Sequence, residues 1–536
     1  MDCQGKDAAP EAVAVATWLG FAAMCIGMFM AILDVQIVAT SLPTIGNALA
    51  VEPDRISWLQ TAYLVSEIVA IATTGLLTRA LSMRWLYVGA VTAFAAASLG
   101  CAASDSFTDL VAWRVIQGFA GGTLIPAVFS AVFLLFPFRR QGLATTLAGV
   151  LAVLAPTVGP IAGGWITSTF SWHWLFLVNV APGIVAAVSA AAFLPAGSTE
   201  LGELASVDPG SLLGLGGGLA ALEVGLKEAP GRGWLSVPVL GLLLVAALAA
   251  AIFVRRSRKA AVPVVDLGLF RERRFVFGCA LSFACGFGLF GSVYLMPVFL
   301  GYVRGHDALE TGSIMLTTGL AQLLVAPIAV AAERRLDARS LSAFGFAAFA
   351  VGSLLSVGQT VGTDAAGMFW PQVVRGAAIM FCLLPPTRIA LGDLPPDNVG
   401  DASSLFNLMR NLGGAIGLAL IDTVVYGLSP GYAAELTARL RAGDPSAALT
   451  IGISPELLAS KLHTGVDAAT QALVAPLIQR AALTQALGEA WLLIGAVAIA
   501  AVILVPFAWK PRSEAARSPS RLPPAPHSLR LSGSEE

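Results

Sequence analysis

Runs of about 20 apolar residues recur along nearly the whole sequence and are separated by short polar breaks. A transmembrane helix needs about 20 predominantly apolar residues, so each run is long enough to cross a bilayer. Of the 536 residues, 57% are hydrophobic and only 12% are charged, whereas a soluble globular chain carries roughly 25% charged residues. The composition therefore excludes a nucleic-acid-binding protein and a secreted disulfide-rich protein. It predicts an all-α polytopic membrane protein, because helices satisfy their backbone hydrogen bonds within lipid.

Fourteen membrane-spanning segments are predicted from these runs. They lie at about 16–39, 57–78, 85–103, 108–135, 143–167, 173–194, 211–228, 235–254, 275–301, 312–331, 340–359, 364–390, 402–427 and 487–509. Lysine and arginine are enriched in cytoplasmic loops. With the N-terminus inside, 21 basic residues fall on the inner side or at the inner end of a span, 8 on the outer side or at an outer end, and 3 deeper within spans. We therefore predict that both termini are cytoplasmic.

Three segments between or after the spans differ from the rest in composition. Residues 195–210 form a Gly-, Glu- and Ser-containing loop that we expect to be a cytoplasmic hinge between two halves. Residues 428–486 mix Pro and Gly with helix-prone stretches and are predicted to form a small insertion on the exterior side. Residues 510–536 are rich in Pro, Ser and Arg, which predicts a disordered cytoplasmic tail.

Two motifs inside the predicted spans combine residue types that apolar helices rarely carry. Residues 114–118 read R-V-I-Q-G, and a buried arginine such as Arg114 is expected to face the protein interior or a water-filled cavity. Residues 155–164 read A-P-T-V-G-P-I-A-G-G, where glycines allow close helix approach and prolines bend the axis. The residues of this second motif that we expect at a packing interface are Pro156, Gly159, Pro160, Gly163 and Gly164.

Taken in order, these motifs resemble the major facilitator superfamily, specifically its fourteen-helix drug:proton antiporter branch of the EmrB/QacA type. Residues 33–43, L-D-V-Q-I-V-A-T-S-L-P, are similar to the first-span element of that branch. Residues 114–118 are similar to its R-x-x-Q-G motif and residues 155–164 to its antiporter motif. Residues 402–407, A-S-S-L-F-N, and 413–417, G-G-A-I-G, are similar to EmrB sequences. The resemblance extends from about residue 17 to 509.

The resemblance implies a fold and a function. It implies two six-helix bundles, at 16–194 and 275–509, joined by two linking helices at 211–254. The cytoplasmic segments would be residues 1–15, the loop at 195–210 and a basic loop at 255–274. The function implied is proton-coupled export of lipophilic or cationic compounds by alternating access across the inner (plasma) membrane. In a Gram-negative cell it also implies a periplasmic adaptor and an outer-membrane channel, and we expect no cofactor or metal.

The sequence departs from this family in the loop after the second span. The family usually reads G-x-L-A-D-R-x-G-R-K there, whereas residues 75–84 read G-L-L-T-R-A-L-S-M-R, with Arg79 at the acidic position. The charge-pairing gate attributed to that aspartate is therefore not carried over to this chain. In the first span, Gln36 and Ala39 replace the usual threonine and asparagine.

Three charged residues within the spans are candidates for coupling protons to substrate. Asp34 is either a structural carboxylate close enough to the outer surface to be hydrated, or a site that binds a proton or a cation. The second interpretation rests on burial, which makes an isolated acid hold a proton more readily. Glu67 is either a second such site or a neutral acid hydrogen-bonded between helices. Arg114 is either a structural tie to backbone carbonyls or the counter-charge of Asp34 or Glu67.

Four further charges fall within predicted spans and are weaker candidates. They are Glu223, Arg375, Arg410 and Asp422. Glu223 is expected to be peripheral, because the seventh and eighth spans are the extra pair, and Arg410 is expected to be structural. The sequence leaves open a dedicated exporter of one metabolite, siderophore or antibiotic, and a sensor that has lost transport. A membrane-embedded enzyme is disfavoured, because the sequence has no P-loop and no H-E-x-x-H motif.

Overall fold

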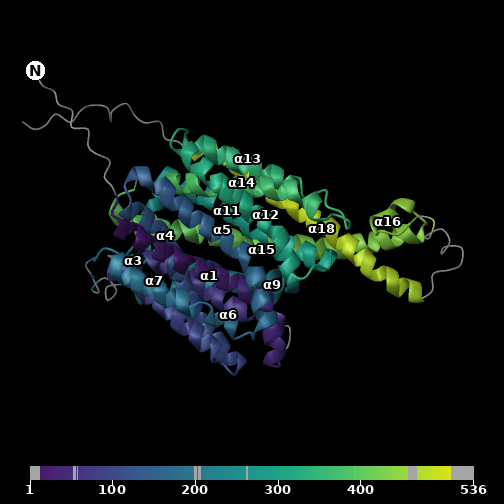
Figure 1. The fold of residues 1–536 in the computed structure, drawn as a ribbon, viewed down its shortest axis with the longest axis horizontal. Coiled ribbons are helices and arrows are strands. Elements are labelled where there is room, and N and C mark those ends of the chain that lie inside the picture. The colour runs from purple at the N-terminus through teal and green to yellow at the C-terminus, as the bar shows by residue number, and fades with distance from the viewer. Residues whose placement is uncertain are drawn as a thin grey trace, which may run out of the picture.

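The computed structural model describes residues 13–508, apart from 52–55, 57, 198, 200–201, 203–206, 261–262, 393, 455 and 457–467. The described residues form helices and no strands (Figure 1). The predicted tail at 510–536, and all but the last three residues of the predicted segment 1–15, lie outside the described residues.

The first half of the chain forms one group of helices. They are α1 (Val15–Ala48), α3 (Trp58–Ala102), α4 (Phe107–Leu135), α5 (Phe138–Thr169), the single turn α6 (Trp174–Leu177) and α7 (Val180–Phe193). Helix α3 covers two of the predicted spans. Between them, at Ser82, its backbone leaves the helical conformation, with φ at 61° and ψ at 156°. Residues 75–84, which depart from the family motif, lie around this break.

Two helices, α9 (Pro209–Arg232) and α10 (Val237–Ser257), link this group to the second half. Asp208 caps α9 by accepting hydrogen bonds from the backbone amides of Gly210 and Ser211. Arg256, in the last turn of α10, donates to both oxygens of the same carboxylate, at 2.7 and 2.9 Å. These bonds from Arg256 and Ser211 hold the pKa of Asp208 well below its usual range. The start of α9 and the end of α10 are thereby fastened together.

The second half forms the other group. It consists of the short helix η1 (Leu267–Arg271), then α11 (Arg273–Val298) with the π-helix η2 (Phe299–Val303), α12 (Ala308–Glu333), α13 (Ala338–Leu354), α14 (Ala365–Leu391), α15 (Pro396–Arg441), α16 (Pro445–Thr450), α18 (Ala468–Leu504) and η3 (Val505–Ala508). Asp307 and Glu310 form a capping box at the start of α12, which satisfies amides that have no partner within the helix.

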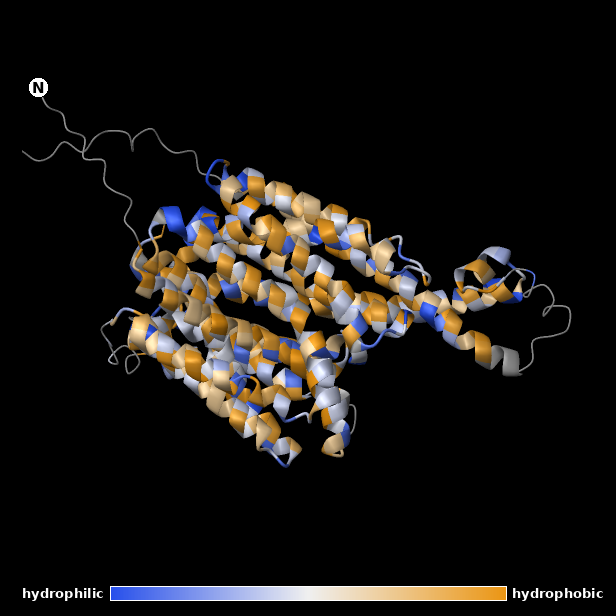
Figure 2. Cartoon of the chain, viewed as in Figure 1, coloured by the Kyte–Doolittle hydropathy of each residue, from blue (hydrophilic) through white to orange (hydrophobic). Residues whose placement is uncertain are grey.

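Each half has its own hydrophobic core. The core of the first half is built from buried side chains of α1, α3, α4, α5 and α7, and the core of the second half from α11 to α15 and α18. Two smaller clusters cross between the halves, one joining α3, α9 and α15, the other joining α5, α12 and α14. Figure 2 shows hydrophobic residues along the length of the helices, and many large hydrophobic side chains on these helices are exposed, which is the pattern of a protein surrounded by lipid.

Each of the fourteen predicted spans coincides with helix, but the number of crossings stays a prediction. Eleven helices in the described residues are long and apolar enough to cross a membrane, and α5, which bends by 44°, makes up to twelve. Helix α13 is apolar but has only 17 residues, which is too short for it to be counted. Helix α3 is counted once although it contains two of the predicted spans. The all-α fold and the many membrane-crossing helices are confirmed.

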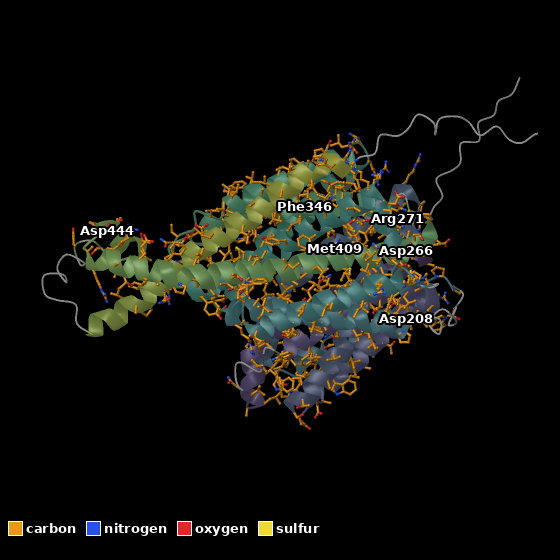
Figure 3. The ribbon with its side chains drawn as sticks, turned by 180° about the vertical axis from the view of Figure 1, so that it is seen from behind. Asp208, Asp266, Arg271, Phe346, Met409 and Asp444 are labelled. Carbon is orange, nitrogen blue, oxygen red and sulfur yellow. The ribbon has the colours of Figure 1, made fainter. Side chains whose placement is uncertain are left out.

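The segments predicted on opposite sides of the membrane lie at opposite ends of the bundle. Asp208, Asp266 and Arg271 lie at one end and Asp444 lies at the other (Figure 3). At the Asp444 end, α15, α16 and α18 extend beyond the bundle and share a small apolar cluster that includes Leu436, Leu440 and Ile478. Hydrogen bonds from Ser446 and Arg439 lower the pKa of Asp444 to about 2. Which end faces the cytoplasm stays a prediction.

Close approach of α11 and α15 depends on Gly413, and this gives a first testable expectation. A Cβ on Gly413 would lie 2.1 Å from the carbonyl oxygen of Phe283 on α11, so the two helices would have to separate. We expect G413A to cost about 1–3 kcal/mol of stability, the usual cost of overpacking. G241A on α10, where nothing lies within 4 Å of the new Cβ, is the matched control. Equal melting temperatures for the two purified variants would contradict this account of the helix contact.

Candidate functional site

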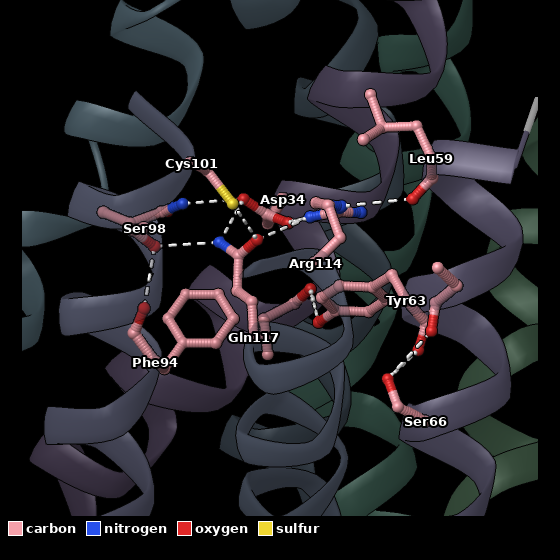
Figure 4. A network of polar contacts seen from close by, with 12 residues as sticks. Asp34, Leu59, Tyr63, Ser66, Phe94, Ser98, Cys101, Arg114 and Gln117 are labelled. Carbon is pink, nitrogen blue, oxygen red and sulfur yellow. Dashed lines mark hydrogen bonds and ion pairs between the residues drawn. The ribbon is translucent and has the colours of Figure 1, made fainter. Parts of the chain in front are cut away.

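A group of buried polar side chains lies inside the first half. Its members, all at most 1% exposed, are Asp34 on α1, Ser98 on α3, Arg114 and Gln117 on α4, and Asn179 just before α7. Four helical segments therefore meet at one polar centre within an otherwise apolar core. Figure 4 shows Asp34 of α1 meeting Arg114 and Gln117 of α4, with Ser98 and Tyr63 of α3 beside them.

Asp34 is the centre of this network. Its Oδ2 forms an ion pair with Arg114, and both side chains are fully buried. Its Oδ1 accepts hydrogen bonds from Asn179 at 2.7 Å and from Gln117 at 3.1 Å. A buried ion pair is stable only when good geometry and further hydrogen bonds offset the loss of water. Asp34 meets this requirement, because both carboxylate oxygens have donors.

Arg114 is held from several sides. Gln117 accepts a hydrogen bond from Arg114 at 2.7 Å, and the backbone carbonyl of Leu59 accepts from Nε at 3.4 Å. The guanidinium lies 4.2 Å from the centre of the Tyr63 ring, a cation–π contact (Figure 4). Its Nη2 is buried without a hydrogen-bond partner among the described residues. This free donor leaves Arg114 able to accept a new partner if Asp34 is lost to a proton or a ligand.

Of the two acids considered as partners of Arg114, the structure pairs it with Asp34. Glu67 lies one helical turn beyond Tyr63 on α3, is 7% exposed, and has no hydrogen bond or ion pair with any described residue. Sequence reasoning missed Gln117 and Asn179 as donors to Asp34. Gln117 could have been found, since it lies one turn from Arg114 within the R-x-x-Q-G motif. Asn179 carried only the weaker signal of an amide inside an apolar run.

The antiporter-motif residues lie on α5 beside α1. Pro156, Gly159, Pro160 and Gly163 are buried, and Gly164 is half-buried. A Cβ on Gly159 would lie 2.3 Å from Cβ of Gln36, so glycine allows α5 to pass against α1 two residues beyond Asp34. Any movement of α5 relative to α1 therefore takes place next to the Asp34 network.

A second ion pair joins the two halves. Arg79 on α3 pairs with Asp401 on α15, and it also donates a hydrogen bond to the carbonyl of Pro263 at 3.2 Å. The other oxygen of Asp401 accepts from the backbone amide of Asp266 at 3.3 Å. A Cβ on Gly75 would lie 2.1 Å from the Asp401 carboxylate, so glycine is required for this contact. Arg79 thus occupies a position where the family carries an aspartate, so the charge there is reversed. Arg79 nevertheless forms an ion pair between the two halves.

The four weaker candidates do not hydrogen-bond to the Asp34 network. Arg375 is 2% exposed, lies 4.2 Å from the centre of the Trp491 ring, and donates to the Gly352 carbonyl at 3.1 Å and to Ser356. Arg410 is 7% exposed and lies over the rings of Phe129 and Phe406, at 5.1 and 5.3 Å.

Two acids complete this set. Glu223 on α9 is half-buried and Asp422 lies on α15, and each has one carboxylate oxygen buried without a hydrogen-bond partner among the described residues. Within the same residues, no group of three or more His, Cys, Asp or Glu side chains is arranged to hold a metal ion.

Comparisons with known proteins show which family the chain belongs to. Residues 24–418 match the family model of the Major Facilitator Superfamily. The colistin resistance protein EmrB of Acinetobacter baumannii is 37% identical over 407 residues, covering 76% of this chain and 80% of that protein. The multidrug export protein EmrB of Escherichia coli K12 is 30% identical over 431 residues, covering 79% and 83%.

A solved structure shows the same fold at much lower sequence identity. The human organic anion transporter MFSD10 superposes with a TM-score of 0.55 at 14% identity, covering 90% of this chain and 99% of that one. Such a likeness shows the fold alone. Together with the family match over most of the chain, it establishes that this protein is a multi-pass membrane transporter belonging to the Major Facilitator Superfamily, in the branch that contains EmrB.

Proposed function

We propose that this transporter exports lipophilic or cationic small molecules from the cell and takes up protons in exchange. Two of its relatives are a colistin resistance protein and a multidrug export protein, which supports drug-like molecules as the substrates. The observation that carries the proposal is the fully buried Asp34–Arg114 pair. A carboxylate in this position can exchange its arginine partner for a proton or for a cationic substrate.

Competition for Asp34 would couple the two movements. When Asp34 is protonated, its attraction for Arg114 falls, and Arg114 turns to neutral partners such as the Leu59 carbonyl, which it already contacts. When the proton leaves, the ion pair re-forms and draws α1 and α4 together. Because proton and substrate cannot both occupy the same carboxylate, each drives the release of the other. The two halves would rock about this level of the membrane, as in alternating-access transporters.

The partners of this transporter would include a periplasmic adaptor and an outer-membrane channel in a Gram-negative cell. A small segment projects from the bundle at the end opposite Asp208; it is built from α16 and the ends of α15 and α18. We propose that the adaptor contacts this segment. Deletion of this projecting segment should then reduce resistance in whole cells more than it reduces transport in isolated membranes.

The test is uptake into inverted membrane vesicles with an imposed proton gradient. A panel of lipophilic cations, neutral dyes and lipophilic acids would be compared in vesicles containing the wild type and vesicles lacking the protein. Gradient-driven accumulation of several unrelated compounds is expected. Accumulation of one compound alone would replace the proposal with a dedicated exporter. Accumulation that persists after the proton gradient is collapsed would contradict proton coupling.

A further inference from the structure

The face of the linking helix α9 that packs against α3 carries charges outside the Asp34 network. The two helices run antiparallel: Lys227 on α9 donates a hydrogen bond to the hydroxyl of Thr61 on α3, and a Cβ on Gly216 would lie 3.4 Å from Cγ1 of Val69. Between these two contacts, Leu219 belongs to the same apolar cluster as Ile68. The stretch of α3 from Thr61 to Val69 is therefore covered by α9.

Glu223 lies on this covered face. It precedes Lys227 by four residues and follows Gly216 by seven, and both spacings keep side chains on the same side of a helix. Its Oε2 is buried and has no hydrogen-bond partner among the described residues. The expectation that Glu223 is peripheral rested on its position in the seventh span. The sequence does not show that this face of α9 packs against α3.

Glu67 lies in the same stretch of α3, is buried, and has no hydrogen bond to another described residue. The charged side chains around it come from three neighbouring helices: Glu223 on α9, Arg114 on α4 and Asp34 on α1. The charged group that acts on Glu223 from its own helix is Lys227, whose Nζ also lies 5.3 Å from the centre of the Trp58 ring. Two carboxylates thus lie at the same apolar interface between α3 and α9, with Lys227 on that interface too.

We propose that Glu67 and Glu223 share a single proton and form a second proton-binding site, half of which is supplied by the linking helix. Two carboxylates in a poorly solvated site cannot both be ionised without a large repulsion, so the pair binds one proton as a unit. The proton is bonded to an oxygen of one acid, and the other acid stays a carboxylate and accepts a hydrogen bond. Lys227 balances the one remaining negative charge.

This site lies next to the Asp34 network. Glu67 is one helical turn from Tyr63, whose ring covers the Arg114 guanidinium. Loss of the shared proton adds a negative charge that attracts Arg114 and weakens its hold on Asp34. The inference rests on the proposed proton-coupled export and gives α9 a part in it, beyond joining the halves.

The test is proton release from the purified, full-length protein on addition of a transported lipophilic cation, measured with a pH indicator in weakly buffered detergent solution. E67Q and E223Q, each isosteric with the protonated acid, are compared with the wild type and with the double variant. E228Q is the matched control, because Glu228 lies on the same helix but pairs with Arg232. Melting temperatures are recorded for every variant, and E223D is made in case E223Q does not fold.

We expect E67Q and E223Q to lose the same proton, and the double variant to lose no more than either single one. The pH midpoint of substrate binding should move by about 1 pH unit in both, and E228Q should match the wild type. Additive losses would show two independent acids and overturn the shared site, as would wild-type release from E223Q. Weaker binding of cations by E223Q at every pH, with unchanged proton release, would make the pair a substrate contact instead. If the wild type itself releases no proton, the proposed function fails, which is a distinct outcome.

Discussion

D34N is expected to abolish substrate-driven proton movement and to destabilise the protein by about 3–5 kcal/mol. The stability loss follows because the substitution leaves Arg114 fully buried without a counter-charge, which is the costly way to break a buried ion pair. The coupling loss follows because asparagine cannot exchange a proton. Melting temperature in detergent measures the first effect, and proton flux in reconstituted vesicles measures the second.

A double variant separates these two effects. D34N/R114Q removes both charges, so it should recover much of the stability that D34N loses, since no uncompensated charge is left. It should not recover proton movement. D109N, at an exposed position near the start of α4, is the control and should behave as the wild type. Recovery of proton movement in the double variant would show that Asp34 and Arg114 are only a structural tie.

R79D and D401R are each expected to reduce transport about tenfold or more, and R79D/D401R is expected to restore it. Either single variant places two like charges where Arg79 and Asp401 now attract, at a contact between α3 of one half and α15 of the other. The change in interaction is between about 1 and 4 kcal/mol, set by how far water reaches the pair, and a tenfold change corresponds to about 1.4 kcal/mol. Uptake into inverted vesicles measures all three variants.

The swapped pair is informative because it reproduces the polarity that the family motif usually has at this loop. D337R, which reverses an exposed acid in the turn before α13, serves as the control for a charge reversal outside this contact. If the double variant stays as inactive as the single ones, the Arg79–Asp401 attraction is not what holds α3 against α15. In that case the backbone hydrogen bonds of Asp401 and Arg79 carry the contact.

The all-α membrane fold could be predicted because its signal is local. Each apolar run of sufficient length forms a helix on its own, and the order of motifs identified the superfamily. The number of crossings is harder to read, because α13 is short and α3 continues through the loop at Ser82. Arg114 could be predicted to need an acidic partner, since charges so deep in apolar segments require partners, but the sequence left Asp34 and Glu67 both open as that partner.

Contacts between distant segments could not be predicted. Arg79 was visibly anomalous in its motif, but its partner Asp401 lies 322 residues away and sits among small polar residues with no distinctive pattern. Glu223 looked peripheral because a sequence does not show which face of α9 meets α3. The role of Asn179 depends on the end of α7 reaching the centre of the bundle. In each case the missing information was the packing of helices against each other.

The central claim is that one site serves proton and substrate in turn, and reconstituted vesicles test it most directly. A substrate gradient is imposed across vesicles that contain purified protein and an internal pH-sensitive dye, with no other energy source. The wild type should move protons against the direction of substrate flow, at a rate that depends on the substrate gradient, and D34N should not. Substrate movement by the wild type without any proton movement would contradict the account.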